Sequence, residues 1–140
     1  MKFLFHKSNQ MIINSDLVEK FSIHHNGVAS VEARLASGGD KFILKEFHNG
    51  KKEENIAEAK NYLAQLVKNC GMKAIFYNDG LEAVNVAFVD KIFCANSDYV
   101  IAKTAAEEII LKSFDGEAED NIEAAKNYLA DLAKTLNGGN

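Results

Sequence analysis

The chain has 140 residues, of which 47% are hydrophobic and 26% are charged, as is typical of globular proteins. Its net charge of −4 argues against direct nucleic-acid binding, which needs a basic surface. No apolar stretch approaches the roughly 18 residues of a membrane-spanning helix, and the apolar run at the N-terminus is too short for a signal peptide. We therefore expect a cytoplasmic protein that does not act at a membrane.

The chain contains an internal repeat. Met1–Phe5 corresponds to Met72–Phe76, and Val18–Phe21 corresponds to Val89–Ile92. Later in the chain the agreement is closest between Ala59–Ala64 and Ala125–Ala130. We expect two repeats, residues 1–71 and 72–140, each of the same fold. Because about 70 residues form a thin core, we expect the two to pack together as one globular unit.

Length differences between the repeats mark the loops, because regular elements cannot absorb insertions without losing register. Residues 17–24 and 29–35 alternate apolar and polar side chains, which predicts half-buried antiparallel strands. The turn between them contains Asn26-Gly27, a hairpin signal. We expect residues 41–47 and Met1–Phe5 to form further strands, giving about four strands in each repeat.

Each repeat is expected to end in an amphipathic helix. Apolar residues recur at helical spacing in both repeats, acidic residues precede them, and Gly71 and Gly138 follow as helix terminators. Because strands precede the helix in each repeat, the predicted class is α+β, with one helix packed on one face of each antiparallel sheet.

Residues with possible chemistry are few. His24 and His25 are placed at a hairpin tip, without the ligand spacing of a metal site. Lys51 and Lys52 precede a helix and could hold an anion there, although the second repeat is acidic at that point. No nucleophile, base and acid are grouped by the sequence. We therefore expect no enzyme, no cofactor and no metal.

The two cysteines occupy unrelated positions in the repeats. This pattern favours free thiols in a reducing compartment over a disulfide. Cys94 replaces Ile23 of the first repeat, on the inward side of a predicted strand, so we expect a buried and unreactive thiol.

The more informative signal is a difference between the repeats. The sheet face opposite the helix is polar in the first repeat, whereas the second has Phe93, Tyr99 and Ile101 there. Exposed apolar patches usually mark contacts. We expect these three residues, with the His24/His25 tip, to form a protein contact. The contact could be internal packing, a homodimer or another protein.

Both repeats share a pattern of an opening strand at a Met, a closing strand that ends in an aromatic residue, and an Ala/Glu/Leu-rich helix. The residues that carry it are Met1–Phe5, Phe47 and Glu53–Leu66, and again Met72–Phe76, Phe114 and Glu119–Leu132. The pattern resembles a short uncharacterised β-meander-plus-helix domain of phages and Gram-positive bacteria. The closing aromatic is Phe rather than the more usual Tyr. The resemblance implies no established activity; a looser similarity is to phage-encoded inhibitors of bacterial defence.

These observations favour a non-catalytic protein-binding module, with an inhibitor of a bacterial defence protein as the form that the resemblance implies. The partner would be another protein or a second copy of the chain. The alternative is a small-ligand-binding protein that uses the cleft between the repeats.

Overall fold

A computed structural model describes residues 2–36 and 39–138, and these form ten strands, in three antiparallel sheets, and two α-helices. The predicted α+β class is confirmed. The chain divides into two compact units, Met1–Phe88 and Val89–Asn140.

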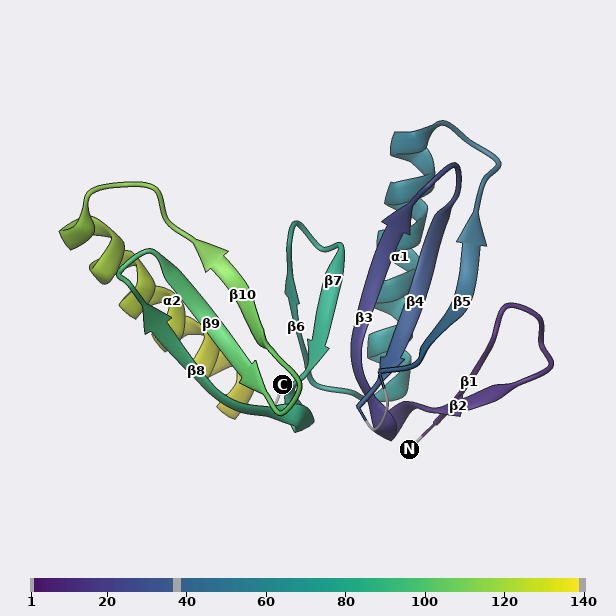
Figure 1. The fold of residues 1–140 in the computed structure, drawn as a ribbon, viewed down its shortest axis with the longest axis horizontal. Helices are drawn as coiled ribbons and strands as arrows, with labels where there is room; N and C mark the ends of the chain where they lie inside the picture. The colour runs from purple at the N-terminus through teal and green to yellow at the C-terminus, as the bar shows by residue number, and fades with distance from the viewer. Residues whose placement is uncertain (1, 37–38, 139–140) are drawn as a thin grey trace. The chain divides into compact units, whose positions relative to one another are not determined.

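The first unit holds most of the strands. Its elements are β1 (Phe3–Phe5), β2 (Ile12–Asn14), the 3-10 turn η1 (Ser15–Leu17), β3 (Val18–His25), β4 (Ala29–Leu35), β5 (Lys41–Phe47), α1 (Lys52–Cys70), β6 (Ala74–Tyr77), β7 (Glu82–Asn85) and the 3-10 turn η2 (Val86–Phe88). Five strands form one sheet in the order β5-β4-β3-β7-β6, while β1 and β2 pair with each other (Figure 1). The helix α1 packs on β3, β4 and β5.

The core of the first unit lies between α1 and the five-stranded sheet. Phe21 of β3, Val31 of β4 and Leu63 of α1 are fully buried there. Ala83 of β7 joins the same cluster, and Leu4 and Ile13 of β1–β2 also belong to it. Both hairpins therefore contribute apolar side chains to this core.

The second unit is smaller. It consists of β8 (Val89–Ala95), β9 (Tyr99–Thr104), β10 (Glu108–Ser113) and α2 (Ala118–Gly138), with the strands in the order β10-β9-β8. The helix α2 packs on β8 and β9. Its buried residues are Asn121 and Ala125, whereas α1 also buries Leu63 and Val67. The core under α2 is thus less well covered than the core under α1.

The boundary of the compact units, after Phe88, differs from the predicted repeat boundary after residue 71. Residues 74–85 follow α1 and form the hairpin β6–β7, in which β7 pairs with β3. Residues 74–85, assigned by the sequence prediction to the second repeat, therefore complete the sheet of the first unit. The sequence does not predict β2 and β7, which are three and four residues long.

The predicted alternation in β3 holds from Lys20 onward and fails before it. Leu17, the first apolar residue of the predicted alternating strand, is exposed in η1, while Val18 is fully buried. A register shift between Val18 and Lys20 changes the side-chain parity there, as a β-bulge does. The predicted turn is present, with Gly27 at φ +79°. Met1, the first residue of the predicted opening strand, lies outside the described residues.

Two asparagines at matching positions fix the loops before the helices. The amide of Asn55 accepts from the N–H of Gly50 at 2.9 Å and donates to its carbonyl at 3.1 Å. Asn121 makes the same pair of bonds with Gly116, at 3.0 and 3.1 Å. A Cβ at either glycine would lie within 3.3 Å of the Asn Oδ1, which explains both glycines. Gly71 ends α1 in the left-handed region as expected, whereas α2 continues through Gly138.

Candidate functional site

The predicted aromatic face lies on β8 and β9. Phe93 and Ile101 are direct cross-strand partners, and Tyr99 pairs with Ala95 two positions along. Tyr99 is exposed, and the other two side chains are half-buried. The Lys91 ammonium lies 4.9 Å from the centre of the Phe93 ring, a cation–π contact that leaves one edge of the patch charged. The three residues do share one face of the sheet.

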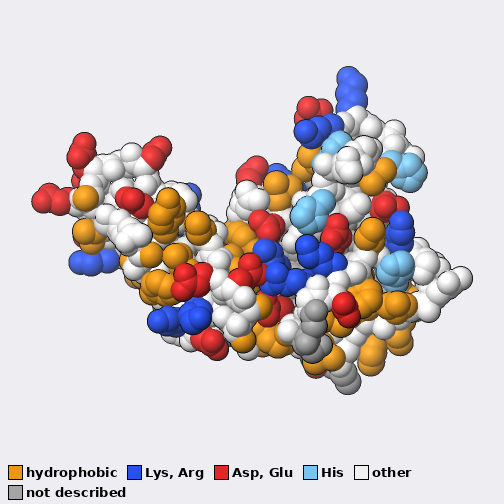
Figure 2. Space-filling view, viewed as in Figure 1, with side chains coloured by type: hydrophobic (Ala, Val, Ile, Leu, Met, Phe, Trp, Pro, Cys, Tyr) orange, Lys and Arg blue, Asp and Glu red, His pale blue; other side chains and the backbone are white. Residues whose placement is uncertain are grey.

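The corresponding face of β3 and β4 is polar (Figure 2). Lys20 forms an ion pair of 2.9 Å with Glu82 of β7, and Arg34 forms one with Glu19. Burial lowers the pKa of Lys20, but hydrogen bonds to Tyr77 and Glu82 outweigh it and raise the pKa above its ordinary value. Burial likewise raises the pKa of Glu82, but Lys20 outweighs it and the net pKa is lowered. The Lys20–Glu82 pair therefore links β7 to β3, whereas the Arg34–Glu19 pair links β4 to β3.

His24 and His25 lie at the end of β3, beside the turn. His24 is exposed and pairs with Ser30, while His25 is half-buried and pairs with Ala29. Among the described residues, no group of three or more His, Cys, Asp or Glu side chains is arranged to hold a metal ion. The histidines belong to the first unit and the aromatic face belongs to the second.

The hairpin β1–β2 carries an apolar surface that the sequence did not single out. Phe3, Phe5 and Ile12 are 53%, 60% and 51% exposed, and Met11 beside them is also exposed. Leu4 and Ile13, on the other side of the hairpin, are buried. Figure 2 shows the resulting group of hydrophobic side chains at the lower right, over β1–β2. The apolar run Phe3-Leu4-Phe5 is equally typical of a strand buried in the core, so the sequence alone does not indicate that Phe3 and Phe5 are exposed.

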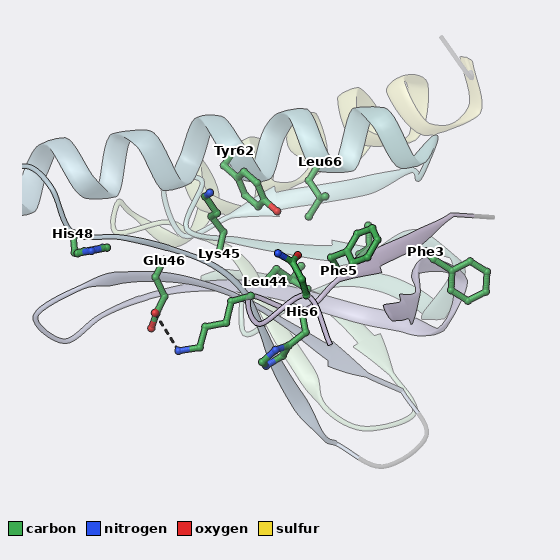
Figure 3. A pocket seen from close by; sticks show the side chains of 12 residues that line it. Phe3, Phe5, His6, Leu44, Lys45, Glu46, His48, Tyr62 and Leu66 are labelled. Atoms are coloured by element: carbon green, nitrogen blue, oxygen red, sulfur yellow. Dashed lines mark hydrogen bonds and ion pairs between the residues drawn. The ribbon is translucent and has the colours of Figure 1, made fainter. Parts of the chain in front are cut away.

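A cavity of about 560 Å³ lies between this hairpin, β5 and α1. Tyr62 and Leu66 of α1 line one side, and Glu46 lies across from them (Figure 3). Glu46 forms an ion pair of 3.1 Å with Lys7, which also lines the cavity. The hairpin is tied to β5 by the N–H of Lys7, which donates to the carbonyl of Ile43 at 2.8 Å. The cavity is therefore bounded by groups of both kinds, apolar and charged.

The cysteines are both free. Cys94 is exposed, so the prediction that it is buried is wrong. The reason is that β8 is an edge strand with a thin core behind it, whereas its counterpart Ile23 lies in a strand flanked on both sides. Cys70 is half-buried, and burial raises the pKa of its thiol, which keeps it protonated.

A comparison with protein-family models gives no match, and comparisons with curated proteins and solved structures give no significant match. Within residues 2–36 and 39–138, neither helix combines the length and the apolar character that crossing a membrane would require.

Proposed function

We propose that this chain is a non-catalytic protein-binding module, built from two repeats with one helix each, and that the outer face of β1–β2 is its principal contact surface. The observation that carries the proposal is the exposure of Phe3, Phe5 and Ile12 on one short hairpin. A contiguous apolar patch of this kind typically marks a protein contact. Aromatic and long aliphatic side chains are also those enriched at the centres of interfaces.

The aromatic face of β8 and β9 is a second contact surface in this proposal. Phe93 and Ile101 form an apolar cross-strand pair, and Tyr99 adds an exposed ring at one end. His24 and His25 stay minor candidates, since their surroundings are polar. A foreign partner such as a bacterial defence protein is suggested by the resemblance of the sequence alone.

A photo-crosslinking experiment tests the proposal. A benzophenone amino acid is placed at Phe5 and, as a matched control, at Glu123, an exposed residue of α2. Irradiation in the native cells is expected to give a covalent protein adduct from position 5 and none from position 123. The absence of any protein adduct at position 5 beyond the control would overturn the proposed function.

A second candidate function is small-ligand binding in the cavity beside β1–β2. Its volume of about 560 Å³ falls within the range of small-molecule sites, and it combines Tyr62 and Leu66 with the Lys7–Glu46 pair. The candidate site thus lies within the first unit. Native mass spectrometry of the purified chain tests it: a bound small molecule that Leu66→Trp removes would support this function, and an unliganded chain would oppose it.

A further inference from the structure

We propose that the hairpin β1–β2 of one copy adds to the edge strand β8 of a second copy, in the manner in which β6–β7 adds to β3. The proposal rests on the proposed function, because it names the partner of the same hairpin. It commits to a head-to-tail contact between identical chains, with β2 of one chain antiparallel to β8 of the next.

The contact between β7 and β3 serves as the template. Lys20 pairs with Val84, Phe21 with Ala83, and Ser22 with Glu82. The N–H of Ile23 extends this pairing by donating to the carbonyl of Leu81 at 2.8 Å. A buried bond of 2.9 Å from the Asn85 amide to the carbonyl of Val18 closes the other end. The template therefore has a defined register and a polar anchor.

Through the internal repeat, the sequences of both strands of the template, β3 and β7, recur elsewhere in the chain. Val18–Ile23 of β3 corresponds to Val89–Cys94 of β8, and Glu82–Asn85 of β7 corresponds to Met11–Asn14. In the described residues, β8 has β9 as its one paired neighbour, and β2 has β1 as its one paired neighbour. Each chain thus has one unpaired edge on β8, the counterpart of β3, and one on β2, the counterpart of β7. Exposed edges of this kind are sites for strand addition.

At two of the three transferred pairs both side chains are apolar, and the third, Lys91 with Ile13, keeps the Lys–aliphatic combination of Lys20 with Val84. The template register places Ile92 opposite Ile12 and Phe93 opposite Met11. The Ile92–Ile12 pair corresponds to the fully buried Phe21–Ala83 pair of the template, with two side chains of intermediate size in place of a large one and a small one. The Phe93–Met11 pair corresponds to the polar Ser22–Glu82 pair, so at this position both strands have changed from polar to apolar. Apolar cross-strand pairs stabilise sheets.

The polar anchor is also present in both repeats. The Oδ1 of Asn85 accepts from the N–H of Ala87 at 3.0 Å, which leaves its Nδ2 to reach Val18. The Oδ1 of Asn14 accepts from the N–H of Asp16 at 2.9 Å in the same way. The Nδ2 of Asn14 has no acceptor among the described residues. The proposed contact would supply one, the carbonyl of Val89.

The exposed core of the second unit fits the same contact. Leu63 of α1 is fully buried, whereas the matching Leu129 of α2 is half-buried. In the first unit, Ala83 of the added hairpin lies in the core cluster with Leu63, and Ala74 packs against that cluster. Their counterparts in β1–β2 are Ile12 and Phe3, both exposed. Addition of β1–β2 would therefore cover two incomplete surfaces at once.

The hairpin need not leave its own unit to make this contact. It is held there by the Lys7–Ile43 backbone bond and by the buried Leu4 and Ile13. These contacts involve the β1 side and one face, whereas pairing would use the outer edge of β2. A head-to-tail contact of this type closes into a ring or extends as a filament, according to the rotation between copies.

Sedimentation velocity on the purified chain over a wide concentration range tests the association. We expect species of two or more chains that Ile12→Lys dissociates to monomers. Ile110→Lys is the matched control, because Ile110 is a similarly exposed isoleucine on β10, the opposite edge of the second sheet. It should leave the association unchanged. A wild-type chain that stays monomeric, or a loss of association in both variants alike, would overturn the proposal.

The register is tested by a disulfide. The template places Gln10 of one chain opposite Cys94 of the next, at a pair separation of about 5.5 Å between Cα atoms, which a disulfide can span. We expect Gln10→Cys in a Cys70→Ser background to form covalent oligomers on mild oxidation, and Cys94→Ser to abolish them. A disulfide confined to single chains, or no disulfide, would overturn the contact between copies.

The two proposals fail separately. A monomeric chain whose position 5 crosslinks to a different protein would end the self-association proposal and leave the protein-binding function intact. Self-adducts from position 5, together with a disulfide from the Gln10→Cys thiol to Cys94 of a second copy, would support both. No protein adduct at position 5 would end the proposed function itself.

Discussion

The hairpins β1–β2 and β6–β7 have the same internal register but different surroundings. Leu4 pairs with Ile13 in the first, and Ile75 pairs with Val84 at the matching place in the second. Yet Ala83 is fully buried, whereas the matching Ile12 is about half exposed. In the hairpin β6–β7, β7 pairs with the strand β3, whereas β1–β2 pairs with no strand outside itself among the described residues. The burial of such a hairpin therefore depends on whether it pairs with the edge strand of a sheet.

The largest expected effect comes from placing a charge at the two matching positions. Ala83→Asp would bury a carboxylate opposite Phe21, where both residues are fully buried, and we expect it to lower the free energy of unfolding by about 4 kcal/mol or more. Ile12→Asp should cost about 0.5 kcal/mol or less in the monomer, because the side chain is already half in water.

Urea denaturation of both variants at low protein concentration measures the contrast. Ala83→Ser is the control for the change of side-chain size without a charge. Equal losses of stability for the two aspartates would mean that the hairpins have the same surroundings, and the comparison between them would be lost.

An intermediate effect is expected at the matching asparagines. Asn85→Ala removes the bond to the Val18 carbonyl and the bond from the Ala87 N–H, so we expect a loss of about 1–3 kcal/mol. Asn14→Ala removes the exposed bond from Asp16 and should cost about 1 kcal/mol or less. Thermal unfolding of both variants measures the difference. A loss at Asn14 as large as that at Asn85 in a monomeric sample would contradict it.

The sequence predicted the long, strongly periodic elements, and the structure contains β3, β4, β5 and both helices where they were expected. It did not predict β2 and β7, whose residues Ile-Ile-Asn and Glu-Ala-Val-Asn show no alternation of apolar and polar side chains. The pairing of β7 with β3 is a contact between residues far apart in the chain, which local patterns do not encode. The division into compact units follows from this pairing.

Prediction of the candidate site was limited in the same way. Strand alternation correctly placed Phe93, Tyr99 and Ile101 on one face, because that depends on register within a hairpin. The prediction that Cys94 is buried was wrong, since a side chain on the inward face of a strand is buried only where core residues pack behind that strand. The sequence did not predict the exposed apolar face of β1–β2, because its exposure depends on which strands the hairpin pairs with.

The smallest expected effect concerns the charges that distinguish the two edges. Glu82, paired with Lys20, has a pKa below its ordinary value of 4.5, so its contribution to stability is complete above that value. The contribution is lost as the pH falls through the lowered folded-state pKa. Glu82→Gln should lower the free energy of unfolding by about 1 kcal/mol or less at neutral pH, since the pair is partly exposed. The variant should also lose less stability than the wild type as the pH falls into this acid range.

The proposed contact of β2 with β8 lacks that titration, because Met11 and Phe93 replace Glu82 and Ser22. We therefore expect acid to weaken the pairing of β7 with β3 while leaving the association between copies unchanged over the same pH range. Denaturation curves and sedimentation velocity, each repeated between neutral pH and the acid range, separate the two responses. Parallel losses of stability and association would show that the edges of β3 and β8 are used in the same way, and the distinction drawn from Met11 and Glu82 would be wrong.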